Sequence, residues 1–185
     1  MQSIEANPKH APVRAWFDRQ GWVPQTFQME VWDAFAQGQD GLLQAPTGSG
    51  KTYAAMGHVL STAAASGSGT LGVKLIWVAP LRALSADIAD AARAMIDGLG
   101  LDWEVGTRTG DTSAKEKAKQ RSALPDILIT TPESLHILIA QKGGVERLSS
   151  AQAVVVDEWH ELLGSKRGVQ VELAVSWIAQ RSAQK

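Results

Sequence analysis

Three short runs of this sequence are apolar almost throughout, and they limit what the chain can fold into more than any other feature. The runs are Leu75–Ala79 (LIWVA), Ile127–Thr130 (ILIT) and Ala153–Val156 (AVVV). A strand with one face in water alternates apolar and polar residues, whereas a strand that is buried on both faces is apolar throughout. These runs therefore predict central strands of a mostly parallel sheet with helices on both faces.

Longer stretches with helical periodicity alternate with short strand-like runs, which predicts a three-layer α/β domain. The predicted strands are Gly41–Gln44, Val73–Val78, Trp103–Arg108, Asp126–Ile129 and Ala153–Val156. The predicted helices are Phe27–Ala36, Lys51–Ala64, Ala83–Gly98, Ser113–Arg121, Glu133–Ala140 and Gly168–Gln180. Ligands of such sheets bind at the carboxyl ends of the strands. The motifs described below fall at these ends, so we expect a ligand crevice there.

The composition excludes several kinds of site. The 185 residues suffice for one ordinary domain, and 44% of them are hydrophobic. Cysteine is absent, which excludes disulfides, thiol chemistry and cysteine metal sites. The four histidines lack metal-ligand spacing, and a net charge of −1 gives no global basic field for nucleic acid. The sequence has no signal segment and no apolar run of membrane length, so we expect a soluble, intracellular domain.

A glycine-rich segment, Ala45–Thr52 (APTGSGKT), joins a predicted strand to a predicted helix. Its glycines let the backbone turn so tightly that successive N–H groups can point at phosphate oxygens, and the helix N-terminus favours the same negative charge. We expect Lys51 to reach the β- and γ-phosphates and the Thr52 hydroxyl to bind Mg²⁺. The candidate nucleotide-binding residues are Thr47, Gly48, Ser49, Gly50, Lys51 and Thr52. The alternative is a plain glycine-rich turn with an exposed lysine.

Two adjacent acids, Asp157 and Glu158, directly follow the apolar run Ala153–Val156. Neighbouring carboxylates at the end of a buried strand are costly unless positive charge lies opposite. Asp157 can hold Mg²⁺ against a triphosphate, and Glu158 can orient or deprotonate an attacking water. The alternative is that both acids merely favour the start of a helix. Together with the phosphate loop upstream, the pair indicates hydrolysis of a nucleoside triphosphate.

The segments Ala45–Thr52 (APTGSGKT) and Asp157–His160 (DEWH) resemble motifs I and II of superfamily 2 helicases of the DExH class. The first motor domain of that class has a RecA-like P-loop NTPase fold. The segments APLRALS, GTRTGDT, TTPESL and DEWHELLGSKRG more narrowly resemble the Lhr-type large helicases, nearest to the bacterial ligase-associated DNA helicase branch. The resemblance implies a catalytic-site role for His160, which would link the state of ATP to a second motor domain.

The segment Gly21–Gln28 (GWVPQTFQ) is similar to the Q-motif, with which such helicases recognise adenine. The Gln28 amide offers a donor and an acceptor that match the N6/N7 edge of adenine. By the resemblance, Trp22 would stack on the base, although the spacing here is one residue shorter than in the common motif. The alternatives are a surface position for Gln28 and core packing for Trp22.

Two turns combine a proline with the start of a predicted helix, and a third turn lies within GTRTGDT. Helix N-termini bind phosphates without reading bases, and the resemblance makes the first two turns motifs Ia and Ib, which hold one nucleic-acid strand. The candidate phosphate contacts are Pro80, Arg82, Thr109, Thr131 and Ser134. Ordinary helix capping is the alternative. Glu133 is expected to point away or to support the helix start, and the role of Lys166 and Arg167 is open.

We expect residues 1–185 to form one RecA-like domain, with residues 1–24 carrying part of the Q-motif. It would be the first motor domain of a longer, bacterial cytoplasmic protein whose second RecA-like domain completes the ATP site. ATP and Mg²⁺ are the expected cofactors, and single-stranded or partly duplex DNA is the expected partner. A DNA ligase, a nuclease and DNA repair follow from the resemblance alone. The alternatives are an RNA helicase domain and a nucleotide-binding module without unwinding activity.

Overall fold

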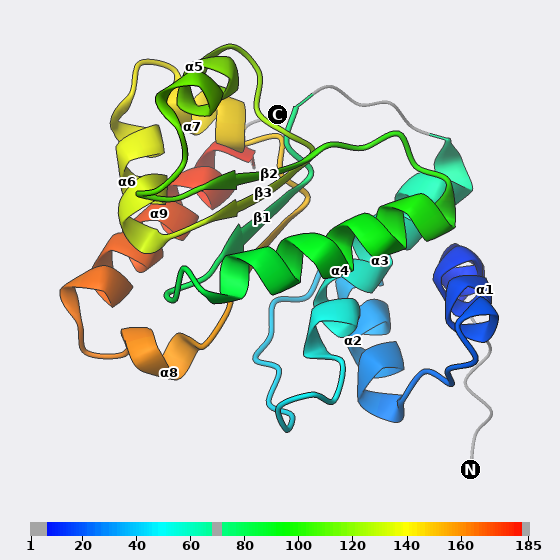
Figure 1. The fold of residues 1–185 in the computed structure, drawn as a ribbon. Coiled ribbons are helices and arrows are strands. Elements are labelled where there is room, and N and C mark those ends of the chain that lie inside the picture. Colours follow the sequence, from blue (N-terminus) through cyan, green and yellow to red (C-terminus); the bar gives the residue numbers. More distant parts are fainter. Residues whose placement is uncertain (1–6, 68–71, 183–185) are drawn as a thin grey trace. The chain divides into compact units, whose positions relative to one another are not determined.

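The computed structural model describes residues 7–67 and 72–182, and the chain divides into two compact units (Figure 1). The first unit is Met1–Gly69 with Ala91–Asp102, and the second is Thr70–Asp90 with Trp103–Lys185. The strands are β1 (Leu75–Val78), β2 (Val105–Arg108), β3 (Ile127–Thr130) and β4 (Ala153–Val156). The helices are η1 (Pro8–His10), α1 (Ala11–Arg19), α2 (Thr26–Ala36), α3 (Lys51–Ser66), α4 (Leu84–Leu99), α5 (Ala114–Ser122), α6 (Pro132–Ala140), α7 (Gly144–Leu148), α8 (Trp159–Leu162) and α9 (Lys166–Ser182). Across the described ranges, no helix has both the length and the apolar character that a membrane crossing requires.

All four of these strands form one parallel sheet in the second unit, in the order β2–β3–β1–β4. Leu75 of β1 is level with Ile127 of β3 and Ala153 of β4, so the carboxyl ends of neighbouring strands meet at one edge. Ile76 and Trp77 point to opposite faces of the sheet, and both are buried. The prediction of an α/β fold with buried parallel strands is therefore confirmed.

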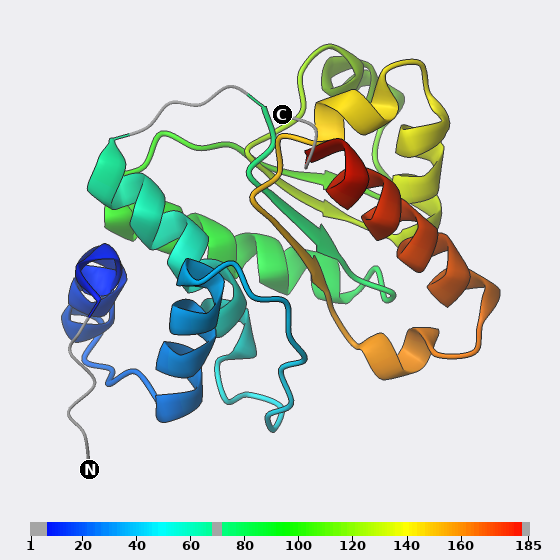
Figure 2. The same cartoon turned by 180° about the vertical axis from the view of Figure 1, so that it is seen from behind.

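Helices α6, α7 and α9 form a packed group in the second unit. Each of the three contacts the other two, and α9 lies alongside α6 in both views (Figures 1 and 2). Their buried core joins Ile76 and Leu128 of the sheet to Leu138 of α6 and Ile178 of α9. Full burial of one such side chain contributes roughly 1.5–3 kcal/mol. This core fixes the strands from one face and leaves their carboxyl ends to the connecting turns.

The first unit is a helical assembly around α3, which η1, α1 and α2 all contact. Trp16 of α1 and Trp32 of α2 are buried at its centre. Gly57 of α3 lies against the Trp32 indole and Gly98 of α4 against the Trp16 indole, so closely that a Cβ at either glycine would overlap the ring. The two glycines therefore allow large aromatic side chains to pack directly on the helix backbones.

The predicted strand Gly41–Gln44 is wrong, because these residues have no regular secondary structure and the Leu42 side chain is 80% exposed. The segment contains no β-branched or aromatic residue, so little in it favours an extended conformation. The boundaries of the other four predicted strands are correct to within two residues. Helices η1, α1, α7 and α8 were missed, because most are too short for a visible period and depend on tertiary packing.

Candidate functional site

Four turns follow the carboxyl ends of the four neighbouring strands in the second unit. The Pro80 turn (residues 79–83) follows β1, the Thr109 turn (109–112) follows β2, and the Thr131 turn (131–134) follows β3. The acidic motif (157–160) follows β4. The expectation that these motifs lie at the carboxyl edge of one sheet is thus confirmed. The phosphate loop (45–52) belongs to the first unit, where no strand precedes it among the described residues.

Asp157 extends the β4 ladder by one residue, because its N–H donates to the carbonyl oxygen of Val78 at 2.9 Å. Its Oδ2 accepts a hydrogen bond from Trp77 Nε1 at 3.3 Å, and its Oδ1 accepts one from the Glu158 N–H at 2.9 Å. Each carboxylate oxygen keeps further lone pairs. The carboxyl group is therefore fixed in orientation but still able to accept more ligands.

The side chains after Asp157 form a small charged group at the start of α8. His160 Nδ1 lies 3.4 Å from Glu158 Oε2, and His160 Nε2 lies 3.4 Å from Glu161 Oε1. The imidazole is 68% exposed, so it lies between the two carboxylates at the surface of the protein. Trp159, in contrast, packs against the buried core of the second unit. The acidic motif thus presents Glu158 and His160 outward while Trp159 anchors the segment.

A metal held by this motif would have few protein ligands. Among residues 7–67 and 72–182 no group of three or more histidine or acidic side chains could hold a metal ion. Mg²⁺ suits such a site, because it typically keeps several waters and binds one or two carboxylates together with substrate phosphates. The oriented carboxylate of Asp157 fits that chemistry.

The hydroxyl groups predicted to contact phosphate make hydrogen bonds within their own turns. Thr131 Oγ1 accepts from the Ser134 N–H at 3.3 Å and caps α6, and both side chains are buried. Thr109 Oγ1 accepts from the Asp111 N–H at 3.3 Å, and Thr112 Oγ1 accepts from the Thr109 N–H at 2.9 Å. In this structure these hydroxyls shape the turns, as the capping alternative describes.

Arg82 stands out from the Pro80 turn toward the Thr109 turn. Its Nη1 donates to both carboxylate oxygens of Asp111, at 3.0 and 3.1 Å. Any side chain at Gly110 would overlap the guanidinium, so this glycine leaves room for the pair. Both partners are more than half exposed. Arg82 is therefore an accessible cation at the carboxyl edge, but one that is paired with Asp111.

Arg167, whose role the sequence left open, lies at the start of α9 and contacts two of these turns. Its Nε donates to Glu133 Oε1 at 2.6 Å and its Nη2 donates to the Pro80 carbonyl oxygen at 2.7 Å. Burial alone would raise the pKa of Glu133, but its own N–H and the Arg167 guanidinium lower that pKa overall. The sequence flags GSKRG as a family pattern but gives no sign of these partners.

In the first unit the Lys51 side chain is hydrogen-bonded to carbonyl groups of its own phosphate loop. Gly48 and Gly50 have φ of +78° and +87°, which glycine adopts without strain. Lys51 Nζ donates to the carbonyl oxygens of Ala45 at 2.8 Å and Pro46 at 3.1 Å. Lys51 is also the first residue of α3, so its ammonium group and the helix N-terminus lie on the same loop.

Gln28 links α2 to the phosphate loop. Its Oε1 accepts from the Gln25 N–H at 2.9 Å, and its Nε2 donates to the Gly50 carbonyl oxygen at 3.1 Å. The surface alternative is wrong, since Gln28 is buried. Trp22 is 43% exposed. The centroid of its ring lies 5.7 Å from that of Trp16, in an edge-on arrangement, and 5.5 Å from that of Tyr53. Trp22 is thus a half-exposed member of an aromatic cluster.

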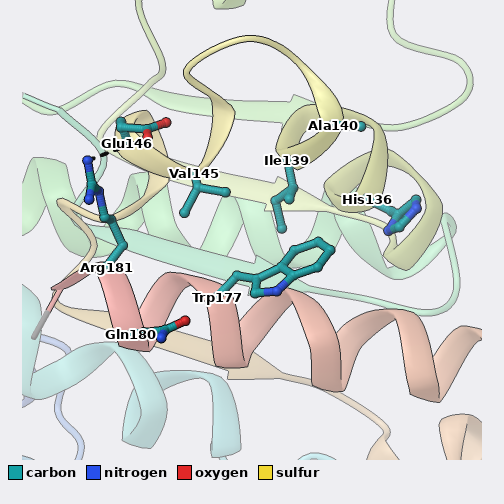
Figure 3. A pocket seen from close by; sticks show the side chains of 8 residues that line it. All are labelled: His136, Ile139, Ala140, Val145, Glu146, Trp177, Gln180 and Arg181. Atoms are coloured by element: carbon teal, nitrogen blue, oxygen red, sulfur yellow. Dashed lines mark ion pairs between the residues drawn. The ribbon is translucent and has the colours of Figure 1, made fainter.

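A separate hollow of about 660 Å³ lies between α6, α7 and α9. Figure 3 shows Ile139 and Trp177 pointing toward one another across it, with the Arg181–Glu146 ion pair of 3.6 Å at one end. None of the predicted site residues lines this hollow. It is therefore distinct from the carboxyl edge of the sheet.

Comparisons with known proteins place the chain among helicases. Residues 25–184 match the DEAD/DEAH box helicase family. The chain is 33% identical over 180 residues to the Lhr helicase/uracil glycosylase of Escherichia coli (strain K12), covering 88% of this chain and 12% of that protein. It is 38% identical over 151 residues to the ATP-dependent helicase Lhr-Core of Methanothermobacter thermautotrophicus, covering 75% of this chain and 18% of that protein.

The fold is similar to that of the Mycobacterium smegmatis helicase Lhr, solved bound to ssDNA and AMP-PNP. The TM-score is 0.78 at 33% identity, and the match covers 92% of this chain and 23% of that one. This likeness confirms the RecA-like helicase fold. The chain spans less than a quarter of the length of each of these three relatives.

Proposed function

The chain belongs to the DEAD/DEAH box helicase family, with Lhr helicases among its relatives, and from that premise we propose that it is the ATP-binding first motor domain of an ATP-dependent DNA helicase or translocase. One observation carries the proposal: Asp157 and Glu158 stand at the carboxyl edge of a parallel sheet beside three turns that can hold a nucleic-acid backbone. That edge is where open α/β sheets bind their ligands.

In the proposed nucleotide site, Lys51 binds the β- and γ-phosphates, and the backbone N–H groups of Thr47–Gly50 surround them. Thr52 is the proposed Mg²⁺ ligand of the loop. Gln28 is the proposed adenine contact, because its amide keeps one donor and one acceptor beyond the bonds to Gly50 and Gln25. The burial of Gln28 equally supports a role in holding the phosphate loop in place. The half-exposed ring of Trp22 offers a surface on which the adenine base can stack.

In the acidic motif, Asp157 is the proposed second protein ligand of Mg²⁺, which when bound neutralises charge on the phosphates. Glu158 is the proposed base that accepts a proton from the attacking water. His160 Nδ1 lies 3.4 Å from Glu158 Oε2, so a change in the position or charge of either side chain can affect the other. We propose that His160 reports the state of the site to a second RecA-like domain in the same protein.

For nucleic acid, we propose that the Pro80, Thr109 and Thr131 turns bind phosphates of one strand, with Arg82 as the main cation. The candidates Pro80, Thr109, Thr131 and Ser134 would act by shaping these turns, because the groups with described hydrogen bonds are bonded to other parts of the protein. A related Lhr helicase was solved with ssDNA, which favours DNA over RNA. Roles in DNA repair beside a ligase and a nuclease belong to the same proposal.

The test is the ATPase rate, with and without single-stranded DNA or RNA, of the longer protein to which this proposed first motor domain would belong. We expect DNA to stimulate hydrolysis and Lys51→Ala to reduce the rate at least about 100-fold. Lys142→Ala, at an exposed lysine in the turn after α6, is the matched control. Hydrolysis that no nucleic acid stimulates would leave only a nucleotide-binding module, and stimulation by RNA alone would indicate an RNA helicase.

A further inference from the structure

Arg167 joins segments that lie far apart in the sequence. Its partners Glu133 and Pro80 are 34 and 87 residues away along the chain. Glu133 lies in the first turn of α6, which follows β3, and Pro80 follows β1, so both partners lie at the carboxyl ends of adjacent strands. A guanidinium suits this position, because its planar fork can hold two acceptors at fixed angles. The contacts therefore set the spacing of the Pro80 and Thr131 turns.

The segment that carries Arg167 is itself tightly held to α8. Ser165 Oγ donates to the Leu162 carbonyl oxygen at 2.7 Å and accepts from the Gly168 N–H at 3.1 Å. A side chain at Gly168 would overlap the same carbonyl group, so only glycine allows this close approach. The acidic motif, α8 and the start of α9 thus form one short, closely packed segment of the chain. Arg167 is the residue of this segment that contacts the Pro80 and Thr131 turns.

Arg167 also changes the charge at the start of α6. The first turn of a helix attracts phosphate through its N–H groups, yet Glu133 places a carboxylate there. The Arg167 ion pair at 2.6 Å neutralises that carboxylate and draws it toward α9. Without Arg167, an unpaired negative charge would stand beside the proposed phosphate site.

We propose that Arg167 is a positioning residue for nucleic-acid binding: it holds the Pro80 and Thr131 turns at a fixed spacing, cancels the charge of Glu133, and ties both turns to the acidic motif. This inference rests on the proposed function. Arg167 acts through these turns and makes no phosphate contact of its own. The two contacts that carry this role, with Glu133 and with the Pro80 carbonyl oxygen, are made by Arg167 and not by its neighbour Lys166.

A second arginine provides the matched control. Arg147 of α7 also bridges separate segments, since its Nη1 donates to the Arg121 carbonyl oxygen at 2.7 Å and its Nη2 to Gln141 Oε1 at 3.3 Å. It precedes β4, so it lies on the amino-terminal side of the strands. Loss of either arginine removes similar packing and hydrogen bonds. Only loss of Arg167 should weaken nucleic-acid binding.

The experiment measures binding of a fluorescent single-stranded oligonucleotide to the longer natural protein, together with its stimulated ATPase. In Arg167→Ala we expect the Kd for DNA to rise roughly tenfold, with a change of less than about twofold in the KM for ATP. Arg147→Ala should keep the wild-type Kd. In the double variant Arg167→Ala/Glu133→Gln we expect part of the affinity to return, because the unpaired carboxylate is gone.

The salt dependence separates positioning from direct contact. A residue that binds a phosphate of a single strand contributes about 0.7 to the slope of log K against log salt. Since Arg167 is paired with Glu133, we expect Arg167→Ala to keep the wild-type slope. A slope reduced by about 0.7, or a Kd equal to that of Arg147→Ala, would overturn the inference. If the wild-type protein binds no DNA, the proposed function fails first and this inference with it.

Discussion

Glu158 has a backbone conformation that L-residues rarely adopt. Its φ is +44°, and among residues 7–67 and 72–182 no other non-glycine residue has a positive φ. A residue held in this region costs roughly 1–3 kcal/mol and is found mainly at functional sites. At this position a glycine would remove the strain but also the carboxylate. The fold therefore keeps an acid directly after Asp157 at some expense of stability.

This strain gives a prediction at the scale of one residue. We expect Glu158→Gly to raise the free energy of unfolding by about 1 kcal/mol and Glu158→Gln to leave it nearly unchanged. Both variants should reduce single-turnover ATP hydrolysis at least about 100-fold, because the proposed base is lost. Urea denaturation and a phosphate-release assay measure the two effects. A Glu158→Gly variant less stable than Glu158→Gln would show that the conformation is not strained.

A pair of histidines, with His10 buried and His58 partly buried, predicts how stability depends on pH. His10 Nε2 lies 3.0 Å from His58 Nδ1, and His10 Nδ1 lies 3.4 Å from Asp33. Burial lowers the pKa of both histidines below 6.5, although Asp33 opposes the shift. The folded state thus favours the neutral rings, so their contribution is present above about pH 6.5 and is lost as the pH falls through the lowered pKa values.

We therefore expect the free energy of unfolding to fall from pH 7.5 to pH 5.5, on the order of 1 kcal/mol for each unit of pKa difference. In His58→Gln one titrating ring is gone, while the Gln side chain can still accept a hydrogen bond from His10. That variant should show a smaller fall over the same range. Denaturation at several pH values measures it, and an equal fall in both proteins would contradict the role of the pair.

At the scale of elements, the apolar runs predicted β1, β3 and β4 well, because a strand that is buried on both faces has an apolar residue at almost every position. The same logic failed for Gly41–Gln44, which has only two apolar residues and nothing that favours extension. The position of the turns could also be predicted, since they follow the strands. Their internal hydrogen bonds and the contacts of Arg167 could not, because they depend on partners brought together only by the fold.

Contacts at the amino-terminal ends of the strands are expected to affect the stability of the protein. Lys74 Nζ lies 2.5 Å from Asp126 Oδ1, and Asp126 Oδ2 accepts from the Glu104 N–H at 2.7 Å. These contacts join the starts of β1, β2 and β3. Because Lys74 is buried, Asp126→Ala leaves a buried charge unpaired and should cost about 3–5 kcal/mol.

Asp111→Ala is the comparison for that variant, because its ion pair with Arg82 is mostly exposed. An exposed pair contributes about 0–1 kcal/mol, so this variant should unfold at nearly the wild-type temperature. Thermal denaturation followed by circular dichroism measures both proteins. Equal melting temperatures for the two variants would mean that the Lys74–Asp126 pair does not hold the amino-terminal ends of the strands.

At the scale of the whole molecule, the proposed functional residues are divided between the two units. The phosphate loop and the Q-motif segment belong to the first, and the acidic motif and the Pro80, Thr109 and Thr131 turns belong to the second. The local geometry of each group is therefore set within its own unit. The proposed site residues do not include an arginine finger, which in related NTPases comes from another domain or protein.

The proposal of a first motor domain therefore predicts a large difference between this chain alone and the longer natural protein. Since an arginine finger contributes about 10³–10⁵ in rate where it has been measured, we expect the isolated 185 residues to hydrolyse ATP at least about 100-fold more slowly, even with DNA present. Nucleotide binding by the phosphate loop should persist, so a fluorescent ATP analogue should bind the isolated chain and bind Lys51→Ala more weakly. Equal turnover by the short and long proteins would show that these residues complete the ATP site by themselves.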